Sequence, residues 1–359
     1  MAVNLADKYA PKIATKFTHG SYLGGKVSND YEFVGVKTIK VLTPITVDEG
    51  DYSRTGTSRY GTTQEMQDSV QELQMTQDKS VSLSIDKGNN KDQMNLKEAG
   101  RMITLQLNER TIPAADKYAF TQYAMNAGKV VAVATPTKAN IMEFIAAAQE
   151  SFDENEVPEE GRFLYINPTN YKFIKLSPEF LGLETLGTKA IGKGHVGECM
   201  GFQIVRVPST KLPANVHFIA TYKGSILFPF KIKDAKYHTD PPGISGDLLE
   251  LRHYYDAFVI GAKSAGVYAC VVTGKQQTAP TITYTAETTD TLAIVSANAT
   301  SIKYTLDGTD PRSSNTALVY AAAIDTSDWT VDDVITVKAI AFRTGYYPSD
   351  ITSSDITVA

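Results

Sequence analysis

The chain offers few residues that could do chemistry, and the first candidates to consider are its cysteines and histidines. His195 and Cys199 lie four residues apart in a glycine-rich stretch, but a zinc site needs three or four ligands and no partners are apparent. His253 and Cys270 could act as base and nucleophile. Both lie in strand-like apolar runs, where a cysteine is usually a small core residue. We therefore expect neither a metal site nor thiol catalysis.

Carboxylate pairs and phosphate-binding loops are the next candidates. Glu159 and Glu160 belong to the acidic run DENEVPEE, which is typical of a solvated loop and not of a tuned acid–base pair. The run AIGKGH lacks the spaced glycine and the Ser or Thr of a phosphate-binding loop. The turn LDGTDP lacks the alternating ligands and the final glutamate of an EF-hand. The sequence therefore predicts that the protein is not an enzyme and uses no cofactor.

Composition is that of a globular protein. The chain has 359 residues, 42% of them hydrophobic, which suggests two or three domains. No apolar run is long enough to span a bilayer, and the first residues lack the apolar segment of a secretory signal. Two isolated cysteines indicate a reducing compartment and no disulfide framework. We expect synthesis in a cytoplasm.

The N-terminal arm is weakly basic. It carries four lysines, Lys8, Lys12, Lys16 and Lys26. A dedicated nucleic-acid binder shows a much denser basic patch. Two interpretations stay open: an arm that faces a polyanion or an acidic neighbour, and a solvated terminus that frays.

The segment that follows the arm does not look like an independent globular unit. A strand, VGVKTIKV, leads into a polar stretch of 35 residues from Pro44 to Asp78, and the run KSVSLSID reads as the returning strand. The polar stretch holds few large apolar residues, and loops of this length are uncommon in compact domains unless they serve binding. A long two-stranded flap is stable only when it lies on something else. We predict a flap that lies on a neighbouring copy, with the contact candidates Asp51, Arg54, Arg59 and Tyr60.

A helix and a mixed body follow the flap. Apolar residues recur at helical spacing at Leu96, Ala99, Ile103 and Leu107. This predicts a helix over about 92–112, with Pro113 as its stop or kink and a second helix that ends at Gly128. Strands and helices then alternate up to about residue 274. We predict an α+β body with a mainly antiparallel sheet.

The composition changes near Gln276. Residues 275–359 contain 17 threonines, five basic residues and ten acidic residues, in short alternating strands with turn signals that predict a β-sandwich. The linker 274–279 is short and polar, so we expect this part to be a knob that can tilt. Trp329, Tyr346 and Tyr347 could form an aromatic platform for glycans, or could pack inside the sandwich, where a lone tryptophan usually lies.

The order of these parts resembles the major capsid proteins of tailed bacteriophages, which have the Hong Kong 97-type coat fold. The runs DYEFVGVKTIKV and VSLSIDKGNNKDQMNLKEAG are similar to coat proteins of phages and prophages of Gram-positive bacteria. The resemblance implies an N-terminal arm (1–30), an extended loop (31–87) that is the flap hairpin, and peripheral and axial domains (88–274), the axial part at about 130–245. It also implies pentamers and hexamers in an icosahedral shell.

The same resemblance implies partners and a location. Such a shell encloses double-stranded DNA, so the arm lysines would lie near its inner face and contact the DNA non-specifically. A portal protein is a further expected partner, and decoration proteins are left open. The protein would be made in the cytoplasm of a bacterial host and reside in the virion.

Two features depart from parts of this family. Some coats carry a scaffolding segment ahead of the arm that a protease removes, whereas here the arm begins at Met1, so we expect a separate scaffolding protein. Some coats join a flap lysine to a neighbour's asparagine. This chain has no lysine between Val41 and Asp78, so we expect non-covalent contacts at the flap tip.

The C-terminal part carries a resemblance of its own. SIKYTLDGTDPRSSNTALVY and ITVKAIAFRTGYYPSD are similar to immunoglobulin-like repeats at the ends of chitobiases and bacterial surface proteins, and on some phage coats. The residues 275–359 are thus expected to be an immunoglobulin-like surface domain. One alternative is a phage tail or surface adhesin that presents a glycan-binding module. Another, a polysaccharide-active enzyme, needs two positioned carboxylates, and the body offers no convincing pair.

Overall fold

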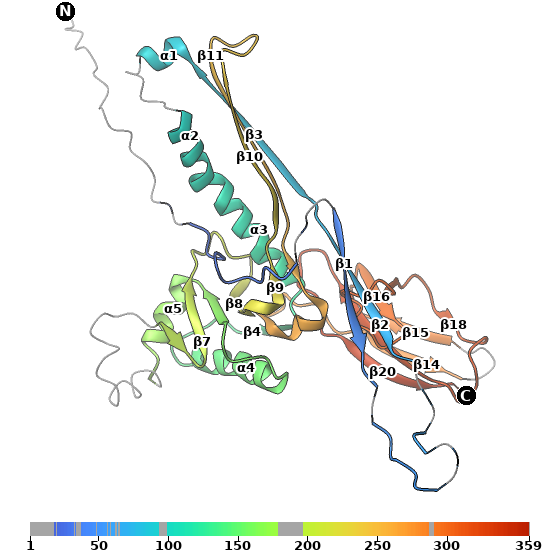
Figure 1. Ribbon diagram of the computed structural model, residues 1–359. Coiled ribbons are helices and arrows are strands. Elements are labelled where there is room, and N and C mark those ends of the chain that lie inside the picture. Colours follow the sequence, from blue (N-terminus) through green and yellow to red (C-terminus); the bar gives the residue numbers. More distant parts are fainter. Residues whose placement is uncertain are drawn as a thin grey trace, which may run out of the picture.

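The computed structural model describes residues 18, 20–31, 33, 37–47, 49–55, 57, 59–61, 63, 65–92, 99–178, 197–286 and 291–358. It has a mixed α+β body and an all-β C-terminal part (Figure 1), which confirms the predicted fold class. The predicted site residues Lys8, Lys12, Lys16 and His195 lie outside the described residues. No helix in the described ranges is long and apolar enough to cross a membrane.

A six-stranded mixed sheet forms the centre of the body. Its order is β4 (Lys129–Val133), β13 (Val267–Val272), β8 (Val216–Tyr222), β5 (Arg162–Ile166), β7 (Phe202–Arg206) and β6 (Glu198–Cys199). The helices α4 (Ile141–Glu154) and α5 (Pro168–Lys175) cover one face, and α3 (Ile112–Met125) covers the other. In β5, Leu164 packs toward α4 and α5 and Tyr165 toward α3. A strand buried on both faces needs no polar alternation, which explains the apolar run FLYI.

The long helix continues further than the sequence predicts. The helix α2 (Ala99–Gln106), a π-helical turn (Leu107–Thr111) and α3 follow one another without a break. Of the two alternatives predicted for Pro113, a stop or a kink, the stop is therefore wrong. A proline lacks an N–H group and its ring crowds the carbonyl four residues earlier. In the preceding wide turn the Ile112 N–H donates to the Leu107 carbonyl, five residues back, which accommodates the ring.

A three-stranded antiparallel sheet projects from the body beside α2 (Figure 1). Its order is β10 (Phe230–Thr239), β11 (Gly246–Tyr255) and β3 (Gln77–Asp86), and the short helix α1 (Lys87–Asp92) follows β3. The run KSVSLSID, expected to return along the flap, belongs to β3 and pairs with β11 instead. The reason is its apolar alternation, because Leu83 lies opposite the buried Leu249 on the inner face of this sheet.

The flap is a shorter hairpin than predicted. The strand β1 (Thr38–Ile45) pairs antiparallel with β2 (Gln67–Gln74), so residues 46–66 form the tip; we call residues 38–74 the flap hairpin. The sequence of β2, QDSVQELQ, has only two apolar residues and therefore no clear strand signal. At the root of the hairpin, Leu73 and Met75 pack with Leu227 and Ile260, beside the small sheet of β9 (Ile226–Leu227) and β12 (Phe258–Val259).

The C-terminal part is a two-sheet sandwich. One sheet has the order β14 (Thr281–Thr285), β15 (Thr291–Val295) and β18 (Ile324–Asp325). The other has the order β17 (Leu318–Val319), β16 (Ser301–Thr305), β19 (Val334–Phe342) and β20 (Thr352–Thr357). Leu292, Ile294, Val337 and Ala339 are fully buried between the sheets. The alternating strands of this threonine-rich segment thus build one apolar core.

The linker is folded against its surroundings, contrary to the expected tilting knob. The Gln276 side chain donates to the Val130 carbonyl over 2.8 Å. Gln277 is buried, and its backbone N–H donates to the Tyr347 carbonyl. The linker is polar because its side chains bond to backbone groups, so polarity there does not indicate freedom to move.

Candidate assembly interface

The residues first considered for catalysis lie in settings that do not activate them. Cys199 and Cys270 are buried; burial raises the pKa of Cys199 to about 11 and raises the pKa of Cys270 even further. Burial and then the charge of Lys233 lower the pKa of His253. His253 and Cys270 belong to different sheets. In the described part of the chain, no group of three or more His, Cys, Asp or Glu residues could hold a metal ion.

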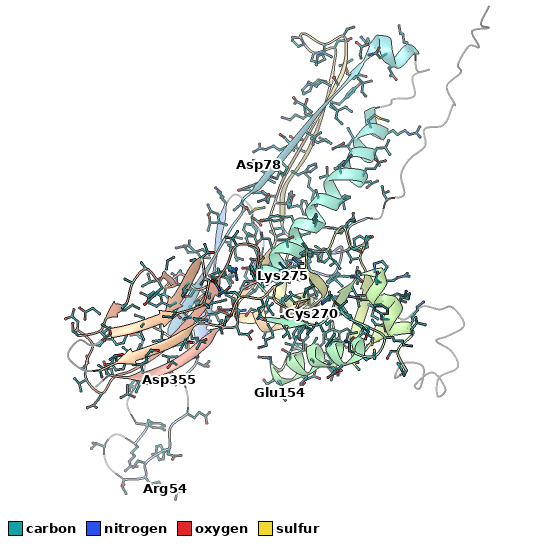
Figure 2. The ribbon with its side chains drawn as sticks, turned by 180° about the vertical axis from the view of Figure 1, so that it is seen from behind. Arg54, Asp78, Glu154, Cys270, Lys275 and Asp355 are labelled. Atoms are coloured by element: carbon teal, nitrogen blue, oxygen red, sulfur yellow. The ribbon has the colours of Figure 1, made fainter. Side chains whose placement is uncertain are left out.

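The flap tip carries large apolar side chains that the subunit leaves in solvent. Tyr60 is 91% exposed, Met66 63% and Tyr52 51%. The rings of Tyr52 and Tyr60 meet edge to face at 5.0 Å, so the two sides of the tip are held together there. Figure 2 shows Arg54 at the far end of the tip, away from the body. Exposed apolar groups gathered on one projection mark a surface that binds another molecule.

The predicted contact residues share this tip. The Ser53 N–H donates to the Arg59 carbonyl over 3.0 Å, which brings the Arg54 and Tyr60 neighbourhoods close to each other across the turn. Asp51 lies on the same exposed segment. The structure therefore places Asp51, Arg54, Arg59 and Tyr60 on the same exposed tip; their contact with a neighbouring subunit stays a prediction.

Solved structures with a similar fold come from phage particles. Mycobacterium phage Che8 matches with a TM-score of 0.60 at 16% identity, over 74% of this chain and 96% of that one. The capsid of cyanophage P-SCSP1u matches with a TM-score of 0.62 at 13% identity, over 74% of this chain and 92% of that one. The mature capsid of bacteriophage PhiM1 matches with a TM-score of 0.61 at 12% identity, over 76% of this chain and 93% of that one. The body has a tailed-phage capsid fold. No curated protein sequence matches the chain.

The C-terminal sandwich matches a different family. Residues 292–356 match a family described as Fn3 associated. The chain thus joins a phage capsid fold to an Fn3-associated domain, as its two resemblances implied.

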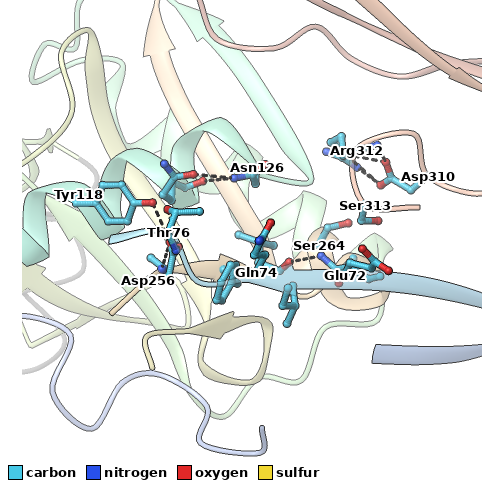
Figure 3. Close-up of a pocket in the computed structure, with 17 residues that line it drawn as sticks. Glu72, Gln74, Thr76, Tyr118, Asn126, Asp256, Ser264, Asp310, Arg312 and Ser313 are labelled. Atoms are coloured by element: carbon cyan, nitrogen blue, oxygen red, sulfur yellow. Dashed lines mark hydrogen bonds and ion pairs between the residues drawn. The ribbon is translucent and has the colours of Figure 1, made fainter. Parts of the chain in front are cut away.

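At the root of the flap hairpin, the carboxylate of Asp256 collects four donors. Its Oδ2 accepts from the backbone N–H and the hydroxyl of Thr76 at 2.7 and 2.9 Å. Its Oδ1 accepts from the Tyr118 hydroxyl and the Ala257 N–H, both at 2.8 Å. Figure 3 shows Thr76, Tyr118 and Asp256 at one end of a hollow of about 400 Å³. Because Thr76 separates β2 from β3, this carboxylate ties the base of the flap to the capsid fold's long helix.

The N-terminal segment is bound to the same helix. The Asp116 carboxylate in α3 accepts from the Ser21 hydroxyl at 2.6 Å and the Tyr22 N–H at 2.9 Å. Leu23 is 1% exposed and joins the body core. Lys26, one of the predicted arm lysines, follows in a turn and is half-buried. The chain is therefore fixed to the body by residue 21, and Lys26 belongs to this fixed part.

The three aromatic residues proposed for a glycan platform lie in separate settings. Trp329 packs against the sandwich core. Tyr347 is 7% exposed, belongs to the body core, and donates its hydroxyl to the Ala214 carbonyl over 2.6 Å. Tyr346 is half-buried, with Arg343 4.0 Å and Lys275 5.3 Å from its ring centre. These positions favour the packing interpretation of all three residues over the platform.

No signal in the sequence pointed to Asp256, which holds the root of the flap. Asp256 follows an apolar strand and resembles any polar residue at a strand end. Its role depends on Thr76 and Tyr118, which are 180 and 138 residues away in the chain. Only the fold brings these groups together.

Proposed function

We propose that this protein is the major capsid protein of a tailed bacteriophage, with a structural role and no catalytic one. The observation that carries the proposal is the flap hairpin, whose tip projects from a body of capsid fold and carries exposed apolar side chains that its own subunit does not cover. In this proposal a second copy of the chain covers Tyr52, Tyr60 and Met66. At about 25 cal/mol for each Å² of apolar surface removed from water, repeated contacts of this kind stabilise a large assembly.

The assembled form we propose is a closed shell. Subunits form pentamers and hexamers, and these build an icosahedral shell around double-stranded DNA inside the virion. Lys8, Lys12, Lys16 and Lys26 are assigned to the inner face, where their charge offsets that of DNA phosphates. A scaffolding protein and a portal are further partners in this proposal. Asp51, Arg54 and Arg59 are assigned to charged contacts around the tip.

The experiment is electron microscopy of the full chain and of one tip variant. Wild-type protein, purified and concentrated, should give closed particles. Replacing the hydroxyphenyl ring of Tyr60 by a hydroxyl group (Tyr60→Ser) should reduce particle yield several-fold. The melting temperature of the free subunit should stay unchanged, because the ring's contact with Tyr52 lies at the exposed tip and not in the core.

A matched control is Val331→Ser, which alters another exposed apolar side chain, on the C-terminal domain. This variant should assemble as the wild type does. Wild-type protein that stays monomeric at high concentration, with or without a co-expressed scaffolding protein, would contradict the proposed function. Normal particle yield from Tyr60→Ser would show that the tip does not contribute to the interface between subunits.

A further inference from the structure

The C-terminal domain reaches the root of the flap hairpin. In the turn between β16 and β17, the Asn315 N–H donates to the Val70 carbonyl of β2 over 3.0 Å. The neighbouring Ser314 forms an antiparallel bridge with Gln71. Because β1 occupies the other edge of β2, this turn lies at the edge of β2 that β1 leaves free and contacts it through one hydrogen bond and one isolated bridge.

The same point of β2 is fastened to the body through the Gln71 side chain. Its Nε2 donates to the Val259 carbonyl over 3.0 Å, and its Oε1 accepts from the Gly261 N–H over 2.7 Å. Gly261 begins a 3-10 helix, and a Cβ atom there would overlap the side chain of Ser313. Hairpin, body and C-terminal domain thus meet at Gly261, at the edge of the hollow described above.

Arg312 fixes the turn to the end of α3. Its guanidinium pairs with Asp310 through Nε–Oδ1 and Nη2–Oδ2 contacts of 3.1 and 2.7 Å (Figure 3). Its Nη1 donates to the carbonyls of Ala127 and Gly128. The arginine side chain is only 13% exposed. A guanidinium group that bonds to a carboxylate on one side and to two carbonyls on the other fixes both the position and the orientation of the turn.

A second anchor lies at the start of the C-terminal domain. The buried Tyr347 enters the body core, as described above, and Gln276 bonds to Val130 of β4. Lys129 of β4 also pairs with Asp350 at 3.1 Å, although this pair is half-exposed and contributes little. Two anchors, one at the linker and one at the turn 310–315, hold the domain against rotation on the body.

We propose that the C-terminal domain is a brace that sets the direction of the flap hairpin. A two-stranded hairpin is marginal alone, and this one has to present its tip at the angle that a neighbouring copy requires. The domain contacts the free edge of β2 at Val70 and Gln71, at the point where the Gln71 side chain is bound to the body. The C-terminal domain therefore contributes to assembly, in addition to any role it has as an exposed domain on the particle surface. The assembly consequence rests on the proposed shell function, whereas the bracing of the hairpin does not.

The test is hydrogen exchange of the full-length free subunit with Arg312→Ala. Removing the guanidinium releases the turn from α3, so the amides of β2 should exchange about tenfold faster or more, since a lost hydrogen bond to a charged group typically changes an opening equilibrium by that factor. Amides of α4, in the opposite part of the body, should keep their protection and serve as an internal reference. The matched control is Arg343→Ala, which removes an arginine that lies over Tyr346 of the same domain.

A second variant covers the case in which Arg312→Ala does not fold. Ser313→Tyr leaves the sandwich core intact and inserts a ring between the turn and Gly261, which should likewise accelerate exchange in β2. Under the proposed function, both variants should also give fewer or misshapen particles. Unchanged β2 protection in the folded variants would overturn the brace. If wild-type protein formed no shells at all, the proposed function would be wrong. The exchange measurement on the free subunit would still test whether the C-terminal domain braces the flap hairpin.

Discussion

A single buried carboxylate, Asp256, organises the base of the flap. It is 3% exposed and faces no cation among its bonded partners, so its charge is balanced by four hydrogen-bond donors. A carboxylate accepts at both oxygens. No other side chain of similar size offers two acceptors to donors on opposite sides.

The amide variant Asp256→Asn tests this arrangement. One acceptor oxygen becomes an NH₂ group that faces donors of Thr76 or of Tyr118, so at least one buried donor loses its partner. We expect the free energy of unfolding to fall by about 1–3 kcal/mol, measured by urea denaturation of the free subunit. The control Asp234→Asn changes an exposed carboxylate and should alter it by less than about 0.5 kcal/mol. Equal unfolding midpoints for wild type and Asp256→Asn would contradict the assignment.

The hydroxyl of Tyr118 predicts a pH dependence. Burial, and the hydrogen bond and charge of Asp256, raise the pKa of Tyr118 from 10.0 to about 12. In the unfolded chain the phenol loses its proton near its ordinary pKa, whereas the folded protein keeps it until about pH 12. The unfolded state is therefore favoured as the pH rises through this window, and stability falls.

The variant Tyr118→Phe should lose less stability over that window than the wild type does. Urea denaturation at several pH values between neutrality and the alkaline limit measures the difference. The other buried tyrosines titrate equally in both proteins, so they cancel in the comparison. Parallel stability curves for the two proteins would show that Tyr118 is not held protonated by this site.

At the scale of elements, the long helix is buried unevenly. Phe120 and Tyr123 of α3 are fully buried in the body core. In α2, Ile103 is only half-buried, and Met102 and Leu105 line a hollow of about 290 Å³ against the inner face of β3 and β11. From Ala99 onward the periodic spacing predicted the helix correctly, whereas Leu96, the first residue of that pattern, lies outside the described residues. The sequence could not reveal that α2 projects beyond the core.

This difference predicts unequal costs of truncation. Phe120→Ala removes a ring from a closed core and should lower the free energy of unfolding by about 3–5 kcal/mol. Ile103→Ala should cost less than the roughly 2 kcal/mol that marks the lower end for fully buried isoleucines. Denaturation of the free subunits gives both values. A larger loss for Ile103→Ala than for Phe120→Ala would place the core around α2 instead.

Some elements were predictable from the sequence and others were not, for physical reasons. The apolar run of β5 and the alternating strands of the C-terminal domain report burial directly. β2 was missed because its partner β1 and the turn 313–315, and not its own side chains, make it a strand. Pro113 was misjudged because proline rules describe a regular helix, and a π-helical turn relaxes the constraint. The binding of Tyr347 to the body depends on contacts between distant segments.

At the scale of the whole molecule, the subunit is a body with two projections. The three-stranded sheet and α2 extend to one side, and the flap hairpin and the C-terminal domain extend to another (Figure 1). The C-terminal domain carries five basic and ten acidic residues. An acidic module beside packaged DNA would raise electrostatic repulsion, so we expect its free surface on the outside of the particle.

The chemistry of the flap predicts how particles come apart. With no lysine between Val41 and Asp78, the tip has no amine for an isopeptide bond to a neighbour. Particles heated in detergent should therefore yield monomers of 39.1 kDa on a gel. A ladder of covalent oligomers, with a lysine–asparagine link located by mass spectrometry, would contradict this expectation.

The central claim is that the flap hairpin joins one subunit to the next in a closed shell. Cryo-electron microscopy of particles formed by the full-length chain tests it most directly. The account predicts closed shells in which the tip residues Tyr52, Tyr60 and Met66 are buried on an adjacent subunit, with the C-terminal domain against the root of its own flap. Particles in which these side chains face solvent, or protein that forms only small open oligomers, would contradict it.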